Sequence, residues 1–403
     1  MKILFFTQYF WPENFRINDV ALYLKKKNHK IKVLTNNPCY PDKSFFSNYY
    51  INKKKFKKLK GIEISRIPSV NRGKNNILIF LNYINFFLCS FVFAINKFMN
   101  KKIDLVFIFC PSPILSALPA IILKKIFKKK VVIWVLDLWP NTLVDLNIIK
   151  NRTLIKILKN IVQFIYNNCD LILVQSESFK TEISKVTRSK CIYFPSWAEE
   201  NIGNSYSKYA KEISQTEKKL KIIFTGNIGE AQSFEYIIKC ANLLKKYNKI
   251  KWIIVGNGRW QNKLEHMIKK NNSEKDFQLI NNVPVTRIKS FFNHADALLI
   301  SLKNKKTFKK TIPGKLQTYL SSGKPIIGMI SGEANKIIKE SKSGLVCEAD
   351  DYKGLKNLLI KFMKMPTNKR KIFGNNGRKY ANEYFNKNKN LNDLEKILLK
   401  YGK

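Results

Sequence analysis

Acidic residues are scarce in this chain. Its 403 residues include 28 Asp plus Glu against 74 Lys plus Arg, so the formal net charge is +46. Histidine occurs only three times, and the seven cysteines are widely spaced, with no CxxC pair. These shortages argue against a disulfide scaffold, a zinc module and a His-rich metal site. We therefore expect no metal and no other cofactor, and the cysteine pattern fits a reducing, cytoplasmic compartment.

The amino terminus lacks the pattern of a secretory signal peptide. The apolar run over residues 3–7 is short, and Gln8 follows it without a small-residue cleavage site. This segment is better interpreted as a buried first strand. Hydrophobic residues make up 45% of the chain and aromatic residues 13%, which excludes disordered and collagen-like architectures. The length predicts two or three domains.

The positive charge leaves three interpretations open. Lysines cluster at 53–60, 124–130 and 303–310, in a chain that is rich in Lys, Asn and Ile throughout. They can be solvated faces that reflect compositional bias. They can also attract an anionic membrane surface, at about 1 kcal/mol per well-placed basic residue. Nucleic acid is the third interpretation, but no zinc finger or RNP1-like run is present, so we expect no nucleic acid partner.

Residues 77–95 form an uncharged segment in which only Asn82, Asn85 and Ser90 are polar. As a helix the segment would be about 28 Å long, close to the ~30 Å hydrocarbon core of a bilayer. An interfacial helix, a core helix and a membrane span are all possible. A span would place the strand-like segments on its two sides in different compartments, although they should share one sheet. We therefore favour an interfacial or half-buried helix.

Strand-like and helix-like segments alternate along the first half of the chain, and the alternation resumes after a linker. Uniformly apolar strands separated by helices predict parallel sheets that are covered on both faces. We expect strands at 2–7, 31–35, 62–67, 103–109, 131–136, 171–174 and 191–194, and then at 220–225, 251–255, 277–280, 296–300, 325–328 and 345–347. We expect helices at 17–27, 75–99, 113–127, 152–167 and 177–185, and then at 233–247, 259–271, 285–293, 314–321, 333–340 and 351–364, with a mostly helical tail over 367–400.

This order predicts an α/β fold of two doubly wound, Rossmann-like domains. We expect an N-terminal domain over 1–197, a linker over 198–218, a C-terminal domain over 219–385 and a C-terminal helix over 386–403. In open parallel sheets, ligands bind beyond the carboxyl ends of the strands, so the loops at those ends are the candidates for chemistry.

Two glycine-containing loops follow strands of the second half. In the first, Gly226-Asn227-Ile228-Gly229, glycines would let backbone amides approach an anion at a helix N-terminus. A plain turn is the alternative. The second loop, Gly256-Asn257-Gly258, matches half of a dinucleotide fingerprint, but Gln stands at position 261. No GxGxxG follows the first strand either, which disfavours a nicotinamide-dependent dehydrogenase.

Charged side chains open two further helices of the second half. Pro313 suits the first position of a helix, and Lys315 then lies in the first turn, where the helix dipole disfavours a cation. A bound anion such as a diphosphate would resolve this conflict, although an exposed lysine is the simpler alternative. Glu333 follows Gly332 at the start of another helix. It is either a partner of the helix dipole or an acceptor for sugar hydroxyls.

Polar residues also follow two strands of the first half. Asp137 lies at the carboxyl end of a buried strand between Leu136 and Leu138, so it must face a polar site or cap the following turn. The aromatic and polar loop over residues 7–16 follows the first strand. Arg16 and Asn18 are placed there to hold an anion or a sugar.

Together these loops resemble glycosyltransferase family 4, the retaining nucleotide-sugar enzymes with the GT-B fold, over nearly the whole chain. The motifs that carry the resemblance are Gln8-Tyr9-Phe10-Trp11-Pro12-Glu13, Asp137-Leu138-Trp139-Pro140, Gly226-Asn227-Ile228-Gly229, Val255-Gly256-Asn257-Gly258, Lys315-Leu316-Gln317-Thr318-Tyr319-Leu320 and Gly323-Lys324-Pro325-Ile326-Ile327. The branch that looks most similar adds N-acetyl-L-fucosamine during O-antigen and capsule assembly. Its members use UDP-sugars and commonly act on undecaprenyl-diphosphate-linked acceptors.

The resemblance implies two domains facing each other across a cleft, with the acceptor on the N-terminal domain, 1–197, and the nucleotide-sugar on the C-terminal domain, 219–385. It implies that the C-terminal helix, 386–403, packs back toward the N-terminal domain, and it implies roles for residues of this chain. Asp137 would be catalytic. The acceptor side would be formed by Glu13, Asn14, Arg16 and Asn18. The donor would be bound by Gly226, Asn227, Gln232, Gly256, Gly258, Lys315, Gln317 and Glu333.

The chain also departs from the family pattern. Where many members carry two glutamates eight positions apart, this chain has Lys310 and Thr318. The usual Arg/Lys pair falls near Asn227 and Gln232, and Asn14-Phe15 replaces a Gly-Gly pair. Lys315, Gln317 and Glu333 would then take over the contacts to phosphate, sugar and hydroxyl groups.

We therefore expect a glycosyltransferase that moves a sugar from a UDP-sugar to a lipid-linked saccharide. It would work in the cytoplasm, peripherally attached to the inner face of the plasma membrane. Two alternatives stay open: a GT-B sugar-nucleotide epimerase, and a non-catalytic, membrane-bound assembly protein.

Overall fold

The computed structural model describes residues 1–40, 43–70, 76–98, 102–198 and 209–402. The chain divides into two compact units, each described here by itself. Unit 1 consists of Met1–Pro195 together with Asn388–Lys403, and unit 2 of Ser196–Lys387. Residues 199–208, which make up much of the expected linker, lie outside the described part of the chain.

Unit 1 is built on an eight-stranded sheet with the order β3-β4-β2-β1-β5-β6-β7-β8. Neighbouring strands are parallel except for β3 and β4. The central strands carry almost only buried apolar side chains, as expected of a parallel sheet covered on both faces. The strands are β1 (Lys2–Thr7), β2 (Lys30–Thr35), β3 (Lys58–Leu59), β4 (Ile62–Arg66), β5 (Leu105–Cys110), β6 (Lys130–Val135), β7 (Leu171–Val174) and β8 (Cys191–Tyr193).

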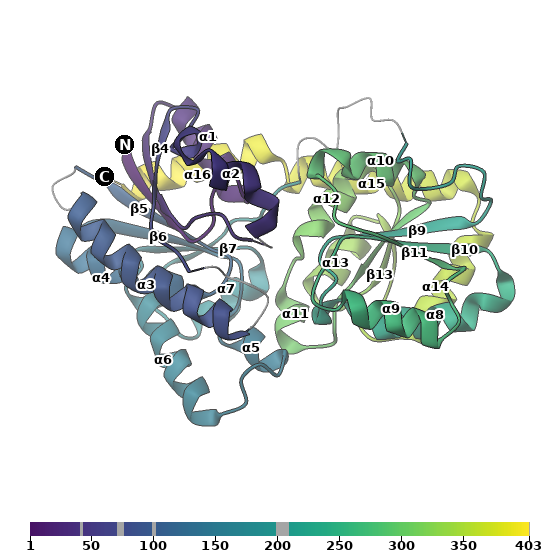
Figure 1. The fold of residues 1–403 in the computed structure, drawn as a ribbon. Coiled ribbons are helices and arrows are strands. Elements are labelled where there is room, and N and C mark those ends of the chain that lie inside the picture. The colour runs from purple at the N-terminus through teal and green to yellow at the C-terminus, as the bar shows by residue number, and fades with distance from the viewer. Residues whose placement is uncertain (41–42, 71–75, 99–101, 199–208, 403) are drawn as a thin grey trace. The chain divides into compact units, whose positions relative to one another are not determined.

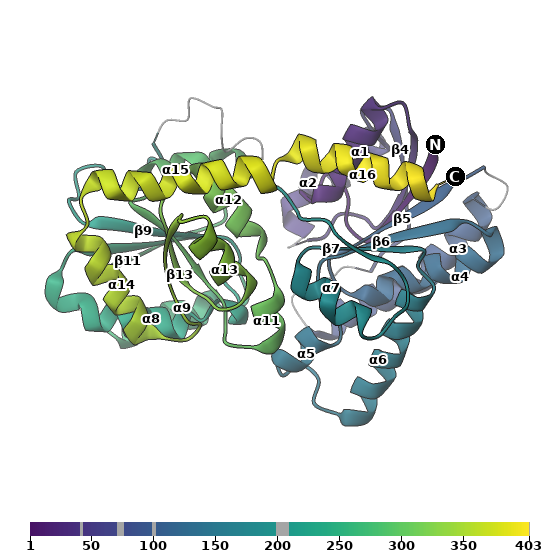
Figure 2. The same cartoon turned by 180° about the vertical axis from the view of Figure 1, so that it is seen from behind.

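Helices cover both faces of this sheet (Figures 1 and 2). On one face lie α1 (Arg16–Lys26) and α16 (Lys387–Tyr401). On the other lie α3 (Asn76–Phe98), α4 (Leu118–Phe127) and α6 (Arg152–Asn167). The remaining helices of unit 1 are α2 (Ser47–Ile51), α5 (Asn141–Asp145) and α7 (Glu177–Ser184).

Helix α3 contains the uncharged segment and has two unlike sides. Phe86, Ala94 and Phe98 belong to the core cluster of unit 1. On the opposite side Phe80, Leu88 and Val92 are 59%, 56% and 58% exposed. Leu78–Phe98 is long and apolar enough to cross a membrane. In this structure it is a half-buried helix with one apolar side uncovered by the described residues.

Unit 2 is built on a six-stranded, entirely parallel sheet with the order β11-β10-β9-β12-β13-β14. Because the chain moves outward from β9 in both directions, the sheet has its switch point between β9 and β12. The strands are β9 (Leu220–Thr225), β10 (Ile250–Val255), β11 (Phe277–Ile280), β12 (Ala297–Ser301), β13 (Ile326–Met329) and β14 (Gly344–Cys347).

Two groups of helices cover the sheet of unit 2 (Figures 1 and 2). One face carries α8 (Phe234–Leu244), α9 (Gln261–Lys270) and α14 (Tyr352–Lys364), which supply much of the core cluster. The other carries α10 (Ile288–His294), α12 (Gly314–Ser322) and α15 (Thr367–Tyr384). The remaining helices are α11 (Lys306–Lys310) and α13 (Glu333–Glu340).

All thirteen strands expected from the sequence are present, and their ends are displaced by at most two residues. The expected helices are present too, although some begin or end as 3-10 turns, as at Ile114–Ala117 before α4. The short elements β3, α2, α5 and α11 were not expected. The helical tail is two helices, α15 and α16, separated by two residues.

Candidate functional site

Two glycine loops meet at the carboxyl ends of β9 and β10 in unit 2. The backbone N–H of Gly226 donates to the carbonyl of Val255 at 2.9 Å. Gly256 has a φ of +146°, and a Cβ atom there would lie 2.0 Å from the Gly226 oxygen. A Cβ atom at Gly258 would lie 2.3 Å from the oxygen of Ile228. Only glycine permits this approach, which leaves a side-chain-free backbone surface with Asn227 exposed beside it.

Lys315 projects from the first turn of α12 toward this surface. Its Nζ atom donates to Oε1 of Gln232 at 2.8 Å and lies 3.7 Å from the centre of the Phe224 ring. A Cβ atom at Gly226 would be 3.6 Å from the same nitrogen. Burial of the ammonium group lowers the pKa of Lys315 to about 7. Among the described residues no carboxylate forms an ion pair with it, so the group is a desolvated cation with only a neutral hydrogen-bond partner.

Two glutamines hold Lys315 in this position. Gln232 is anchored by its backbone oxygen, which accepts a bond of 2.6 Å from the hydroxyl of Ser301. Gln317 is buried. Its side-chain amide is oriented so that the nitrogen faces the start of α12 and donates to the carbonyls of Pro313 and Gly314 at 3.1 and 3.0 Å. Instead of reaching for a ligand, Gln317 fixes the turn from which Lys315 extends.

Other side chains brace the same edge of the sheet and have no obvious signal in the sequence. The hydroxyl of Tyr319 accepts the backbone N–H of Thr225 at 2.8 Å, which ties α12 to the end of β9. The carboxylate of Asp350 accepts from the Ser233 hydroxyl at 2.6 Å and from the backbone N–H of Asn304 at 2.9 Å. These bonds order the loops that follow β9, β12 and β14.

Glu333 is the first residue of α13, directly after the loop that follows β13. It is partly exposed and belongs to the same edge of the sheet as Lys315. The helix has no side-chain cap at its N-terminus, so the carboxylate suits the positive end of the helix dipole. Both interpretations of Glu333, dipole partner and hydroxyl acceptor, are consistent with this position.

In unit 1, Asp137 follows β6 at the carboxyl edge of the sheet. Its carboxylate accepts a hydrogen bond of 2.5 Å from the hydroxyl of Thr142 in α5. Burial raises the pKa of Asp137, and the bond from Thr142 opposes that rise. Asp137 is therefore tied to the first turn of α5 through the Thr142 side chain, although the N-terminus of that helix has no side-chain cap. Its catalytic role stays a prediction.

The loop after β1 is shaped by two of the predicted acceptor-side residues. Glu13 is buried, and its carboxylate accepts the backbone N–H groups of Phe10, Cys39 and Tyr40 at 3.2, 2.9 and 2.8 Å. Burial raises the pKa of Glu13 to about 7, although these bonds act in the opposite direction. Glu13 thus joins two loops and does not point outward.

Asn18 supports the same loop from α1. It accepts the backbone N–H of Trp11 at 3.0 Å and donates to the carbonyl of Glu13 at 2.6 Å. Asn14 is exposed and Arg16 is partly exposed. Of the four predicted residues, these last two are placed to meet a ligand from solution.

A buried group of amides lies directly after β1 and β2 and was not expected. Gln8 donates to Oδ1 of Asn82 in α3 at 2.8 Å. Oε1 of Gln8 and both polar side-chain atoms of Asn36 have no hydrogen-bond partner among the described residues. Because buried polar groups are nearly always bonded, this region is suited to a polar ligand or ordered water. The sequence offered one sign of this group, because a polar residue follows each of the two apolar strands directly.

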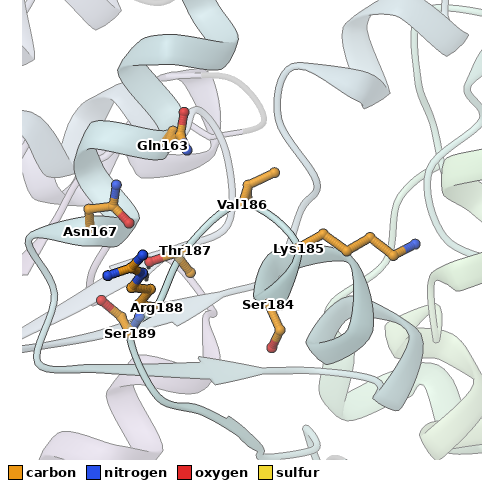
Figure 3. A pocket seen from close by; sticks show the side chains of 8 residues that line it. All are labelled: Gln163, Asn167, Ser184, Lys185, Val186, Thr187, Arg188 and Ser189. Atoms are coloured by element: carbon orange, nitrogen blue, oxygen red, sulfur yellow. Dashed lines mark hydrogen bonds between the residues drawn. The ribbon is translucent and has the colours of Figure 1, made fainter.

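A separate polar cavity of about 480 Å³ lies in unit 1, away from the carboxyl edge. It is formed at the carboxyl ends of α6 and α7, which run antiparallel to the strands. Figure 3 shows Arg188, Asn167 and Ser189 close together, while Lys185 extends away from them; the Lys185 ammonium bonds Glu182 at 2.6 Å. The lining residues are Gln163, Asn167, Ser184, Lys185, Val186, Thr187, Arg188 and Ser189.

Residues 206–380 match the family model described as "Glycosyl transferases group 1". The matched residues lie within unit 2, so this part of the chain is similar to that family. It contains the glycine loops, Lys315, Gln317 and Glu333. No curated protein sequence is significantly similar to the chain.

Solved structures resemble the whole chain. Sucrose-phosphate synthase from Thermosynechococcus elongatus is 10% identical, with a TM-score of 0.74 and 99% of each chain covered. HepE from Anabaena, in complex with UDP and glucose, is 13% identical, with a TM-score of 0.71, covering 99% of this chain and 100% of that one. WaaG, a glycosyltransferase involved in lipopolysaccharide biosynthesis, is 12% identical, with a TM-score of 0.66, covering 97% and 99%.

At these identities the likeness establishes the fold, which is the GT-B fold of two α/β units with parallel sheets. The expected fold class is therefore confirmed. The match of residues 206–380 to the group 1 family model agrees with this fold.

Proposed function

We propose that this protein transfers a sugar from a UDP-sugar to a lipid-linked saccharide. The observation that carries the proposal is the ammonium group of Lys315, partly desolvated and without a carboxylate partner among the described residues, next to the side-chain-free loops at Gly226 and Gly256. A diphosphate bound against these loops would supply the missing negative charge. The complex of HepE with UDP and glucose supports a nucleotide-sugar as the donor.

The same arrangement suits the chemistry of transfer. When the bond between sugar and diphosphate breaks, negative charge develops on the departing UDP. A cation that is already fixed in place stabilises that charge without reorganisation. We propose that Lys315 and the backbone amides of the loops perform this task without a metal ion, and that the reaction retains the configuration at the anomeric carbon.

On unit 1 we propose that Asp137 orients the acceptor or stabilises charge at the reacting centre, and that Asn14 and Arg16 contact the acceptor. The proposed donor is UDP-N-acetyl-L-fucosamine, on the strength of the family resemblance. The proposed setting is the assembly of O-antigen or capsule on undecaprenyl diphosphate. WaaG, with the same fold, takes part in lipopolysaccharide biosynthesis, which supports a role in surface polysaccharides.

A lipid-linked acceptor requires the enzyme to reach the membrane, and we propose that α3 attaches it peripherally to the inner face of the plasma membrane. The exposed side of the helix carries Leu81, Ile84, Leu88 and Val92 at spacings of three and four residues, which form one stripe. Its neighbours α4 and α6 on the same face of the sheet, and α3 itself, contain no Asp or Glu. An apolar stripe on helices whose only charged residues are basic suits an anionic lipid surface.

The decisive experiment is a screen of UDP-sugars with a short lipid-diphosphate-sugar acceptor, read by mass spectrometry, with and without a metal chelator. We expect the acceptor to gain the mass of one sugar and UDP to be released in both conditions. Interconversion of donors without use of the acceptor would identify an epimerase. Absence of UDP binding in calorimetry would identify an assembly protein instead.

A further inference from the structure

A second cavity in unit 1, of about 410 Å³, is lined mainly by lysines. Lys2 comes from β1, Lys30 and Lys32 come from β2, and Lys102 comes from the segment before β5. Ile3 and Ile103 complete the lining. The cavity lies at the amino ends of these strands, near the N mark in Figure 1. Asp137, Asn36 and the loop after β1 are at the carboxyl ends, so this cavity is separate from the candidate acceptor site.

The register of the sheet explains why the lysines converge. Lys2 is paired with Lys30, and Leu4 is paired with Lys32, in the parallel ladder of β1 and β2. Because side chains alternate between faces along a strand, the lysines of both strands share the face on which Leu4 lies. Leu4 belongs to the core cluster that also contains Phe98 of α3. The cavity therefore lies on the face of the sheet that α3 covers, at the edge of the core cluster.

The acidic groups nearby do not neutralise this cavity. The carboxylate of Asp104 accepts the backbone N–H of Lys2 at 2.7 Å. Glu63 forms a long ion pair with the Lys32 ammonium, at 3.9 Å, and offsets part of the charge of that one lysine. Among the described residues, Lys2, Lys30 and Lys102 have no carboxylate partner. Four like charges around one hollow repel each other, and a concave surface of one sign concentrates counter-ions.

We propose that this four-lysine cavity binds a phosphate group that carries two or more negative charges. Each ammonium group offers three donors and no acceptor, so several lysines can share the oxygens of one phosphate as point charges. The phosphate comes either from the headgroup of a phospholipid or from a soluble polyanion. Lys102 follows Phe98, the last residue of α3, by four positions in the chain, and this proximity to the apolar helix favours the lipid.

The test compares two double variants that remove the same charge. Lys30→Gln/Lys102→Gln changes two exposed lining residues, and Lys353→Gln/Lys361→Gln changes two exposed lysines of α14 in unit 2. Pyrophosphate binding is measured by calorimetry. Lipid binding is measured by flotation with vesicles of phosphatidylcholine that contain phosphatidic acid, whose phosphate monoester carries up to two negative charges. The Lys30→Arg/Lys102→Arg variant keeps the charge and serves as the rescue.

We expect the Lys30/Lys102 glutamine variant to bind at least one probe about tenfold or more weakly than the control variant does, and the arginine variant to retain binding. A loss with pyrophosphate alone identifies a soluble polyanion as the source. A loss that includes the vesicles identifies a lipid headgroup. If both glutamine variants bind both probes equally, the lysines are an ordinary solvated surface and the proposal is overturned.

Discussion

The Lys315 ammonium group and the Gln232 side chain, 83 positions apart in sequence, are joined by a hydrogen bond of 2.8 Å. The bond holds a cation at the carboxyl edge of the sheet without neutralising it, since an amide oxygen carries no net charge. The ammonium form of Lys315 is therefore unfavourable in the unliganded site, and a bound anion would stabilise it. This relationship leads to two predictions about UDP.

Replacing Lys315 with alanine should weaken UDP binding by about 1.5–3 kcal/mol, the range for a hydrogen bond to a charged group. Folding should be preserved, because the variant removes a desolvated charge. Calorimetry measures the affinity and a thermal melt checks the fold, with Lys353→Ala on α14 as a matched control. Equal UDP affinity in the Lys315 variant and the wild type would disprove the assignment.

UDP binding should take up a proton at slightly alkaline pH. Burial lowers the pKa of Lys315 to about 7, so the free site is largely uncharged above that pH, whereas the diphosphate favours the ammonium form. Affinity should therefore decline as the pH rises above 7. Calorimetry at one alkaline pH, in buffers with different ionisation enthalpies, measures the uptake, which Lys315→Met should lack.

The lowered pKa of Lys315 also determines how the free energy of unfolding changes with pH. The pKa of Lys315 in the folded protein lies below the ordinary lysine value of 10.5, so the unfolded chain binds the proton more tightly. The free energy of unfolding, compared with that of Lys315→Met, should rise as the pH increases from 7 toward 10.5. A flat difference between the two proteins across this range would show that the ammonium is not desolvated.

Asp137→Asn should reduce turnover on the order of 100-fold or more, the scale of losing one electrostatic contact in a transition state, while UDP affinity is retained. Thr142→Val is the matched variant, since it removes the hydroxyl that donates to Asp137 and leaves the carboxylate. If Asp137 is only a cap, the two variants should lose stability and activity to the same extent. A specific loss of turnover in Asp137→Asn alone would support catalysis.

Substituting serine for Phe80, Leu88 and Val92 should release the protein from membranes, because these are the most exposed apolar residues of α3. Three other phenylalanines of the helix are poor targets, because Phe86 is fully buried and Phe91 and Phe93 pack against the core. High salt should remove only the part of the attraction that the lysines contribute.

Vesicle flotation measures the release, with Ile372→Ser, an exposed residue of α15, as the control for surface changes. Transfer to a lipid-embedded acceptor should fall further than transfer to a short soluble one. A folded triple variant that floats and works like the wild type would make α3 an ordinary half-buried helix.

Local pattern was sufficient for most of the fold. Strands such as β1 and β6 carry buried apolar side chains at nearly every position, and this signal does not depend on distant contacts. The two-residue β3 is too short to show a period. Helix α11, Lys306–Lys310, has the sequence KTFKK, which reads as a solvated loop until the burial of Thr307 and Phe308 is known.

The candidate site was predictable where it depends on backbone chemistry and not where it depends on long-range partners. Gly256 and Gly258 could be found because only glycine allows such a loop, and Lys315 because its charge conflicts with its place in a helix. The orientation of Gln317 and the burial of Glu13 could not be foreseen. Both follow from contacts that the fold creates, such as the amides of Cys39 and Tyr40 that surround Glu13.

Helix α16 belongs to unit 1 although unit 2 precedes it in the chain. Its Leu391, Leu394 and Leu398 are buried, and Glu395 lies 3.1 Å from the ring of His29. A ribosome releases this helix only after every residue of unit 2. The earlier part of unit 1 must therefore wait with an uncovered apolar face until all of unit 2 has been made, so a stall during translation of unit 2 would leave an aggregation-prone intermediate.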